Sequence, residues 1–291
     1  MTLSLAEPLV VPKARLLDAS AIEAYRRDGL IVAPVRIAPD LLARMRASLD
    51  ALLINCADTA PESLVCPHIP NGARHPASEA SAWFDYATLP PILDLVEQII
   101  GPDIILWGSQ VFCKPARIGR EVPWHQDGEY WPIRPLATCS VWIALDPATP
   151  ENGCMRYLPG SHAAGSVYPH RDAMRPDRVL GQEIEPASFD AAPARDDVLD
   201  AGQFSLHDIF LVHGSAHNRS AQRRAGFVVR YMPATSRFAR DLAGMQQQAG
   251  ISFSLARRPL WLLRGSDRGG NDFHIGHGEE FAATPRYSDD L

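Results

Sequence analysis

The sequence predicts a mainly β protein with flanking helices, because its composition and patterning favour many short elements over a few long ones. The 291 residues include 25 Pro and 20 Gly, which interrupt helices. Beyond residue 101, short runs rich in β-branched and aromatic residues alternate with turn signals such as Pro-Gly-Ser-His. Hydrophobic residues make up 46% and charged residues 21%, as in ordinary globular proteins, which excludes extensive disorder. A β-sandwich or barrel fits these observations.

The first hundred residues are predicted to be largely helical. In order, we expect a helix over 19–28, a short strand over 30–35, a helix over 39–55, a long loop over 57–85 that covers a site, and a helix over 91–100. Gly29 is suited to ending the first helix, and Pro39 to beginning the second, in which leucines recur at helical spacing.

Strands dominate the part of the chain that follows. They are predicted over 104–112, 139–145, 155–158, 203–212 and 227–232. The stretch 163–200, rich in Pro and Asp, is interpreted as an insertion, and the tail after residue 234 holds a helical patch near 238–248 and an apolar segment at Trp261.

Charge and cysteine content narrow the classes of function. The net charge is −6, from 28 Lys+Arg and 34 Asp+Glu, which disfavours a nucleic-acid partner because such proteins usually have a basic face. There is no signal-peptide pattern and no apolar run of about 18 residues, so we expect a cytoplasmic protein without a membrane partner. The five cysteines are scattered and form no CxxC pair, which predicts buried thiols rather than disulfides or a zinc site.

The stretch WHQDGEYWP (124–132) contains a candidate metal site. In an extended segment, residues i and i+2 point to the same side, so His125 and Asp127 can present an imidazole and a carboxylate to one point. Because His-x-Asp is common by chance, a third ligand must come from elsewhere, and His213 is the candidate, since it follows an apolar run and precedes Gly214. Two histidines and a carboxylate on one side form the facial triad of non-haem Fe(II) oxygenases, which leaves positions for a co-substrate and O₂.

A candidate site for a carboxylate lies just downstream. Arg224 opens the next strand-like run after His213, and a guanidinium can bind a carboxylate through two hydrogen bonds. Together with the hydroxyl of Ser215 it would suit the C5 carboxylate of 2-oxoglutarate. Arg223 is the alternative, although only one of two strand neighbours can face inward. Arg230 shares the parity of Arg224 and can touch the co-substrate or the substrate.

The remaining histidines and the aromatic residues near the motif have simpler interpretations. His207 and His217 flank His213, but a His213–His217 ligand pair would need a helix, which the apolar β-type run disfavours. The aromatic residues line a substrate pocket or form ordinary core, and alternation along one strand predicts that only one of Trp107 and Phe112 faces the site.

Three blocks carry a family resemblance: WHQDGEYWP, ENGCMRYLPGSH (151–162) and HGSAHNRSAQRR (213–224). They resemble the phytanoyl-CoA dioxygenase (PhyH) family of Fe(II)/2-oxoglutarate-dependent oxygenases, and the resemblance extends from about Tyr25 to Pro233. It implies a double-stranded β-helix of the jelly-roll or cupin type. Halogenating relatives replace the metal-binding carboxylate with a small residue, so the presence of Asp127 favours hydroxylation.

The resemblance also implies roles for individual residues. The metal ligands are His125, Asp127 and His213, and the co-substrate contacts are Arg224, Ser215, Gln110 and Trp142. The expected domain spans residues 1–291, with helices over about 15–100, the jelly-roll core over about 101–235 and a C-terminal extension over about 236–291.

The expected activity is hydroxylation of a C–H bond in a small organic metabolite by Fe(II), 2-oxoglutarate and O₂, with release of succinate and CO₂. Desaturation, demethylation, epimerisation or cyclisation at the same centre stays open, as does a non-catalytic cupin-like binding module, which would not need all four of the triad and Arg224. A CoA thioester would favour a basic entrance, whereas 57–85 contains Arg74 as its basic residue, so a small metabolite is preferred. Either a monomer or a homodimer fits.

Overall fold

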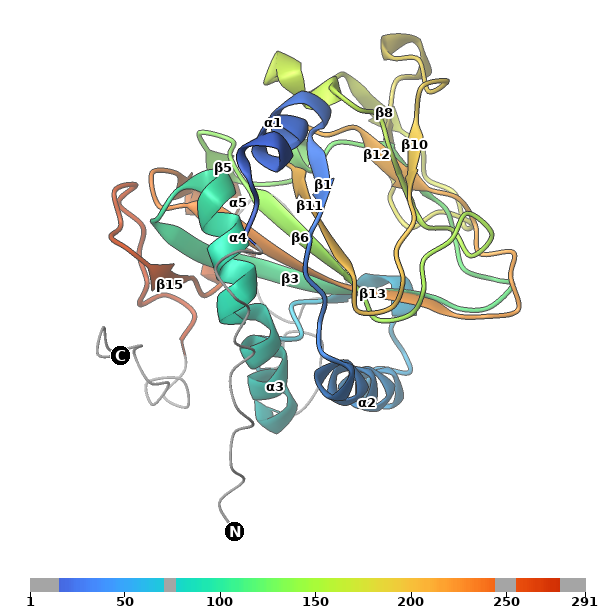
Figure 1. Ribbon diagram of the computed structural model, residues 1–291, viewed down its shortest axis with the longest axis horizontal. Helices are drawn as coiled ribbons and strands as arrows, with labels where there is room; N and C mark the ends of the chain where they lie inside the picture. The colour runs from blue at the N-terminus through green and yellow to red at the C-terminus, as the bar shows by residue number, and fades with distance from the viewer. Residues whose placement is uncertain (1–15, 71–76, 244–254, 278–291) are drawn as a thin grey trace.

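Two antiparallel sheets lie opposite each other at the centre of the molecule (Figure 1). The structure is a computed structural model, and it describes residues 16–70, 77–243 and 255–277. The larger sheet contains β1 (Leu30–Val32), β2 (Leu64–Val65), β3 (Ile104–Lys114), β6 (Cys139–Ala144), β11 (Phe204–Asp208), β13 (Arg224–Pro233) and β15 (Trp261–Arg264). The smaller sheet contains β4 (Val122–His125), β7 (Met155–Tyr157), β10 (Arg195–Asp197) and β12 (His213–Ser215).

The strand order brings distant parts of the sequence together. The larger sheet runs β1-β11-β6-β13-β3-β15, with β2 paired to β3 beside this path, and the smaller sheet runs β10-β7-β12-β4. Two further ribbons pair β5 (Ile133–Arg134) with β14 (Arg237–Phe238) and β8 (His170–Asp172) with β9 (Gln182–Ile184). The predominance of antiparallel strands confirms the prediction of a mainly β protein with flanking helices.

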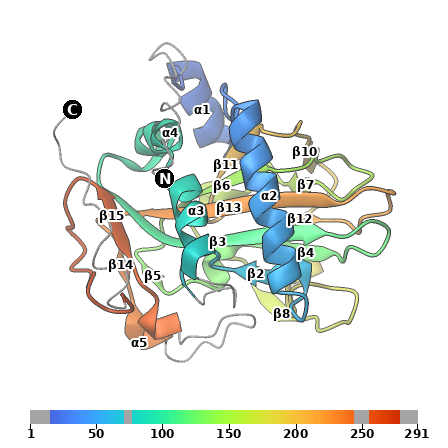
Figure 2. The same cartoon turned by 90° about the horizontal axis from the view of Figure 1, so that it is seen from below.

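Helices cover one face of the larger sheet. They are α1 (Ala19–Asp28), α2 (Pro39–Asn55), α3 (Ala77–Ala87) and α4 (Pro90–Ile100), whereas Ala243 of the short α5 (Arg240–Ala243) belongs to a separate apolar cluster with Trp107 and Phe238. Figure 2 shows α2 and α3 lying across the strands. The carboxylate of Asp18 caps α1 by accepting a hydrogen bond from the Ala21 N–H at 2.8 Å, and Gly29 ends this helix in the left-handed region at φ 79°. Pro39 begins α2, as the sequence predicts.

The central strand β13 separates two environments by simple alternation. One side carries Ala225, Phe227, Val229 and Tyr231, all of which are fully buried in the main hydrophobic core. The Phe227 ring packs against Trp83 of α3, with 4.8 Å between the ring centroids. The other side carries Arg224, Gly226, Val228 and Arg230, and it faces away from the helices. One strand therefore contributes to both the core and the polar interior between the sheets.

A β-bulge in β3 interrupts this alternation. Arg230 pairs with Gly108, whereas Tyr231 pairs with Leu106. Trp107 of β3 therefore has no partner in β13 and is the extra residue of the bulge. The Trp107 ring lies 4.6 Å from the Trp131 ring, and the guanidinium carbon of Arg230 lies 5.0 Å from Trp131 and 6.0 Å from Phe112. The prediction that only one of Trp107 and Phe112 faces this side is therefore wrong, because the bulge shifts the parity between them.

The loop predicted over 57–85 is also partly wrong. Residues 64–65 form β2, and α3 begins at Ala77, while 71–76 lie outside the described residues. Trp83 and Tyr86 of α3 are buried in the main core. That tertiary contact stabilises a helix whose own sequence lacks a strong apolar period.

Two later segments form strands of the sheets, which the sequence does not predict. Residues 195–197 of the supposed insertion form β10, which pairs with β7 at the edge of the smaller sheet. The apolar segment at Trp261 forms β15 and pairs with β3. Of the helical patch predicted near 238–248, the described part contains α5, and 244–254 lie outside the described residues.

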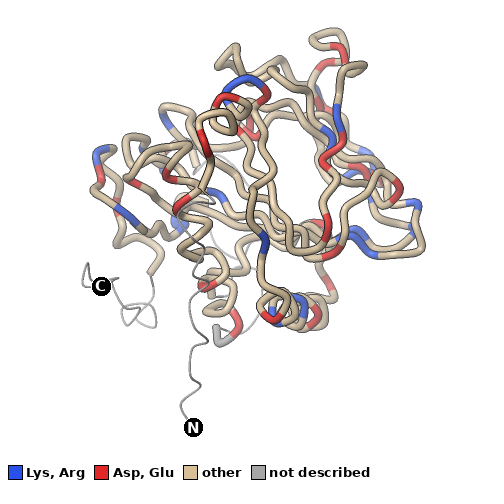
Figure 3. Tube along the Cα trace, in the orientation of Figure 1, with Lys and Arg blue, Asp and Glu red and all other residues tan. Residues whose placement is uncertain are grey.

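Charged residues are interspersed along the chain. Figure 3 shows Lys and Arg mixed with Asp and Glu over the view, without a face of one sign. In the described ranges, no helix is long and apolar enough to cross a membrane. All five cysteines are buried, as the sequence predicts.

Candidate metal centre

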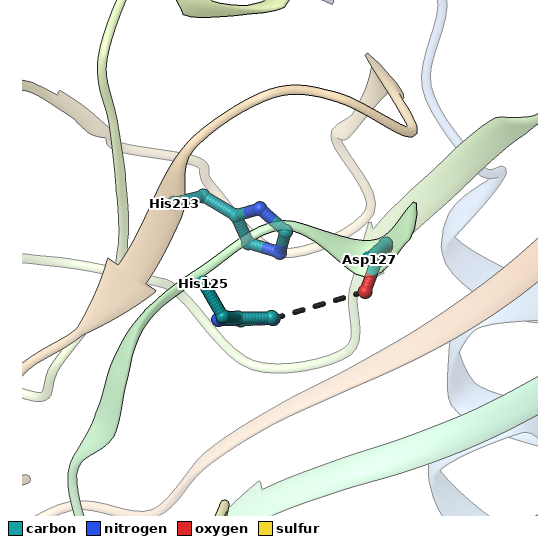
Figure 4. Close-up of side chains that lie close together, drawn as sticks. All are labelled: His125, Asp127 and His213. Carbon is teal, nitrogen blue, oxygen red and sulfur yellow. Dashed lines mark ion pairs between the residues drawn. The ribbon is translucent and has the colours of Figure 1, made fainter. Parts of the chain in front are cut away.

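His125, Asp127 and His213 converge between the two sheets (Figure 4). His125 ends β4, Asp127 opens the 3₁₀ turn η3 (Asp127–Glu129), and His213 begins β12. One ligand atom from each residue lies within 4.8 Å of the others, and all three residues are buried. The His125 Nε2 atom is 3.7 Å from Asp127 Oδ1, and the two imidazole centroids are 4.2 Å apart. The geometry brings together the three residues that the sequence predicts.

Strand pairing explains this convergence. β12 runs antiparallel to β4, and His213 pairs directly with His125. The sequence suggests that His213 follows a single strand over 203–212, but β11 ends at Asp208, and the Asp208 carboxylate accepts a hydrogen bond from a turn N–H. This turn carries the chain from the larger sheet to the smaller one. Gly214 lets β12 approach β4, since a Cβ there would lie 2.9 Å from a β4 carbonyl oxygen.

The tautomers of the two histidines suit metal binding. Backbone carbonyl oxygens of Pro123 and Leu211 lie 2.9 Å from Nδ1 of His125 and His213, respectively. A carbonyl only accepts, so each Nδ1 carries a hydrogen and Nε2 is the nitrogen of each ring that can bind a metal. Burial and the neighbouring His125 lower the pKa of His213 to about 3, so this imidazole is neutral near pH 7. Two imidazoles and a carboxylate match the donor set preferred by Fe(II) in facial triads.

His207 lies directly beside the triad. Its Nε2 atom is 3.7 Å from Asp127 Oδ2, and its ring centroid is 5.2 Å from that of His213. Although burial raises the pKa of Asp127, the imidazoles of His125 and His207 hold that pKa well below its usual range, so the carboxylate is ionised. No role for His207 is predicted from the sequence. Alternation along β11 is the signal that could have placed it. Phe204 and Leu206 face the main core, so His207 must face the opposite side, towards the smaller sheet.

Arg224 is buried at the start of β13. It donates a hydrogen bond from Nη2 to the Gly153 carbonyl at 2.8 Å, and its guanidinium carbon lies 5.3 Å from the Trp142 ring. Burial lowers its pKa to about 10, so it stays charged near neutral pH. No described residue accepts a hydrogen bond from its Nε. Arg223, by contrast, faces the other way and pairs with Asp146 at 2.8 Å, which leaves Arg224 as the guanidinium available to a carboxylate.

Lys114 and Ser215 adjoin Arg224. Lys114 pairs with Arg224 in the β3–β13 register, and its ammonium donates to the carbonyl oxygens of Ser215, at 3.2 Å, and Ala216. Burial, together with the charge of Arg224, lowers the pKa of Lys114 to about 6. Ser215 is itself buried. Lys114 is not among the site residues predicted from the sequence, because its place there depends on the pairing of β3 with β13.

Gln110 and Trp142 lie in different parts of the site. Trp142 lies beside the Arg224 guanidinium, and its ring covers Gly226 so closely that a Cβ there would lie 2.2 Å from Cζ2. Gln110 instead accepts a hydrogen bond from Arg230 Nη2 at 3.2 Å. The co-substrate roles predicted for both residues stay predictions.

Comparison with known proteins places the chain in a family. Residues 25–226 match the phytanoyl-CoA dioxygenase (PhyH) family. Human peroxisomal phytanoyl-CoA dioxygenase is 31% identical over 205 residues, which cover 64% of this chain and 60% of that relative, so the chain spans under two thirds of its length. L-proline trans-4-hydroxylase from Streptomyces griseoviridis is 27% identical over 248 residues, covering 77% of this chain and 88% of that protein.

Solved structures show the same architecture. The non-haem monooxygenase ThoJ in its apo form is 28% identical, with a TM-score of 0.66 over 86% of this chain and 85% of that one. This likeness confirms the predicted jelly-roll fold. Because the family match extends over more than half of the sequence, this chain belongs to the phytanoyl-CoA dioxygenase (PhyH) family.

Proposed function

We propose that the protein is an Fe(II)- and 2-oxoglutarate-dependent dioxygenase that hydroxylates a C–H bond of a small organic molecule. The observation that carries this proposal is the convergence of His125, Asp127 and His213, with both histidines holding Nε2 available. When bound, iron and 2-oxoglutarate supply O₂ activation, with release of succinate and CO₂, and the oxidant for the C–H bond.

The residues around the triad divide the remaining tasks. His125, Asp127 and His213 hold the metal, and His207 orients the Asp127 carboxylate from behind. Arg224 binds the distal carboxylate of 2-oxoglutarate with help from the Ser215 hydroxyl. Trp142 restricts the movement of the Arg224 guanidinium and keeps water from it.

A small metabolite is the substrate class that we favour. The relative from Streptomyces griseoviridis, named for hydroxylation of L-proline, aligns over most of its own length, whereas the human relative named for phytanoyl-CoA aligns over 60% of its length. The net charge of −6 gives no general attraction for the phosphates of CoA. The burial of all five cysteines supports a reducing compartment such as the cytoplasm, and either a monomer or a homodimer is compatible with this activity.

Anaerobic titration of the protein with Fe(II) and 2-oxoglutarate tests the proposal without knowledge of the substrate. We expect a weak visible charge-transfer band that needs both additions and is absent in Asp127→Ala. A substrate screen that measures succinate, followed by mass spectrometry, then identifies the reaction. Gain of one oxygen atom indicates hydroxylation, and loss of two hydrogens indicates desaturation. If the wild-type protein binds 2-oxoglutarate without any such band, a non-catalytic binding module is the better description.

A further inference from the structure

A second buried arginine lies on the same side of β13 as Arg224. Arg230 is 8% exposed, and its guanidinium sits between the rings of Trp131, at 5.0 Å, and Phe112, at 6.0 Å. Its backbone partner in β3 is Gly108, where an added Cβ would lie 3.3 Å from Nη1 of the buried Arg258 and 4.0 Å from Cδ of Arg230. Arg230 therefore extends into the polar interior beside the metal centre, and nothing in the proposed chemistry of iron and 2-oxoglutarate uses it.

The hydrogen-bonding capacity of Arg230 is largely unused. A guanidinium has five N–H groups, yet the acceptor provided within the described ranges is the neutral Oε1 of Gln110, at 3.2 Å from Nη2. Its Nε has no partner in the described structure. No carboxylate of the described residues forms an ion pair with it. A buried cation without an anion is costly, which indicates that an anion binds there.

Asp127 does not fill this role. Burial and the charge of Arg258 lower the pKa of Arg230, and the Asp127 carboxylate counteracts this effect without forming an ion pair with Arg230. Arg230 nevertheless stays protonated near neutral pH, as arginine does in proteins. In the proposed oxygenase, the charge of Asp127 is directed at the metal. An anion bound by Arg230 would thus lie close to the metal centre without competing with Asp127.

The co-substrate does not supply this anion in the proposed arrangement. Its C5 carboxylate is assigned to Arg224 and its keto-acid end to the metal, so neither end is left for Arg230. An anion at Arg230 is then a second molecule.

Resting on the function proposed above, we propose that Arg230 binds the carboxylate of an organic-acid substrate and so places a nearby C–H bond at the metal centre. The planar guanidinium can hold a carboxylate through two parallel hydrogen bonds. Trp131 and Phe112 provide apolar surface for the carbon skeleton, which an inorganic oxyanion would not need. An acyl thioester carries its charge on distant phosphates and would leave Arg230 without a partner.

Matched pairs of acids and amides test this inference. The wild-type protein, loaded with Fe(II) and 2-oxoglutarate, is screened with L-amino acids and short monocarboxylic acids, each beside its primary amide. We expect substrate-dependent succinate formation, and a change in the anaerobic charge-transfer band, with at least one acid and with none of the amides. Inorganic phosphate and phosphinate form a further arm. A response to these or to the amides that equals the response to the acids overturns the inference.

Variants locate the effect at Arg230. In Arg230→Gln, we expect the KM for the responsive acid to rise about 10- to 100-fold, as for loss of hydrogen bonds to a charged group, while the KM for the co-substrate changes less than about threefold. Arg230→Lys keeps the positive charge but loses the paired donors of the planar guanidinium. It should still prefer the acid over the amide, but should bind the acid more weakly. Arg237→Gln, which alters an arginine whose side chain is 55% exposed, serves as the matched control.

Different results would contradict the oxygenase function and the role of Arg230 in substrate binding. If the charge-transfer band is absent, the oxygenase function itself is wrong. If the band forms but acids and amides respond equally, or if Arg230→Gln raises the KM for the co-substrate instead of that for the acid, the assignment of Arg230 to the substrate is wrong. The wild-type comparison of acids with amides stays decisive even if Arg230→Gln does not fold.

Discussion

The two faces of the larger sheet differ sharply in chemistry, although their residues alternate along the same strands. On β13, Phe227 and Tyr231 face the helices and the main hydrophobic core, whereas Arg224 and Arg230 face the smaller sheet. The helix-side face gains stability from apolar burial. The site-side face buries charged groups, which costs stability unless they find partners.

Neighbouring residues of one strand therefore have different roles, one in stability and the other in ligand binding. Because consecutive side chains point to opposite faces, a substitution at one position should alter stability and a substitution at the next should alter ligand binding. Substitutions on the two faces of the sheet test this division.

The largest effect is expected at the metal centre. Asp127→Ala should reduce substrate-coupled succinate formation below detection, because the triad loses its carboxylate. The midpoint of thermal unfolding should change little, since an ionised carboxylate is costly to bury. Asp196→Ala, which removes a half-exposed carboxylate paired with Arg156, should leave turnover unaffected. Full 2-oxoglutarate decarboxylation by Asp127→Ala would show that the metal ligands are misassigned.

Phe227→Ala tests the helix-side face. Removing this fully buried ring should lower the free energy of unfolding by about 3–5 kcal/mol, through lost apolar burial and the cavity left beside Trp83. Urea unfolding measures the loss, and Phe227→Leu should show a smaller one. The KM for the co-substrate, measured on the folded fraction, should stay constant. A marked rise in that KM would mean that the two faces are not independent.

Arg224→Gln tests the site-side face at the other end of the strand. We expect the KM for the co-substrate to rise about 10- to 100-fold, which corresponds to about 1.5–3 kcal/mol for hydrogen bonds to a charged group. Steady-state kinetics with varied 2-oxoglutarate measures it. The neighbouring Arg223→Gln is a matched control, because Arg223 pairs with Asp146 on the opposite face. An unchanged KM in Arg224→Gln would remove this residue from the co-substrate site.

The smallest effect is expected at Gly226, where a substitution should change both stability and co-substrate binding. A Cβ at this position would lie 2.2 Å from Trp142 Cζ2, so Gly226→Ala must displace the indole. Overpacking of this kind typically costs about 1–3 kcal/mol. Since Trp142 stacks on Arg224, we also expect a several-fold rise in the KM for the co-substrate. Ala225→Gly, on the helix side, should leave that KM unchanged, and a normal KM in Gly226→Ala would argue against any role of Trp142.

Much of the candidate site could be predicted because its signals are local. The i, i+2 spacing of His125 and Asp127 directs both to one point, and strand alternation predicts that only one of Arg223 and Arg224 faces inward, while the choice of Arg224 follows from the family resemblance. The structure brings His213 to His125 and shows Arg223 already paired with Asp146. The roles of these residues in metal and co-substrate binding await the experiments above.

Other features of the site could not be predicted, because they depend on which strands become neighbours. His207 meets Asp127 only because β11 lies opposite the smaller sheet, and Lys114 reaches the Ser215 carbonyl only because β3 pairs with β13. The bulge at Trp107 makes a prediction from alternation wrong. One extra residue in β3 reverses which face each residue on the other side of the bulge points to.

Local sequence patterns are enough to predict the mainly β fold, the helices at 19–28 and 39–55, and the identity of the three converging residues. These depend on periodicity, on helix start and stop residues, and on short motifs, all of which act over a few neighbouring residues. Long-range contacts instead establish that Gln110 accepts a hydrogen bond from Arg230, that α3 forms within the segment predicted as a loop, and that Arg230 is buried without a carboxylate from the described residues. The reason is that burial and pairing of a side chain depend on residues a hundred or more positions away, which no local pattern specifies.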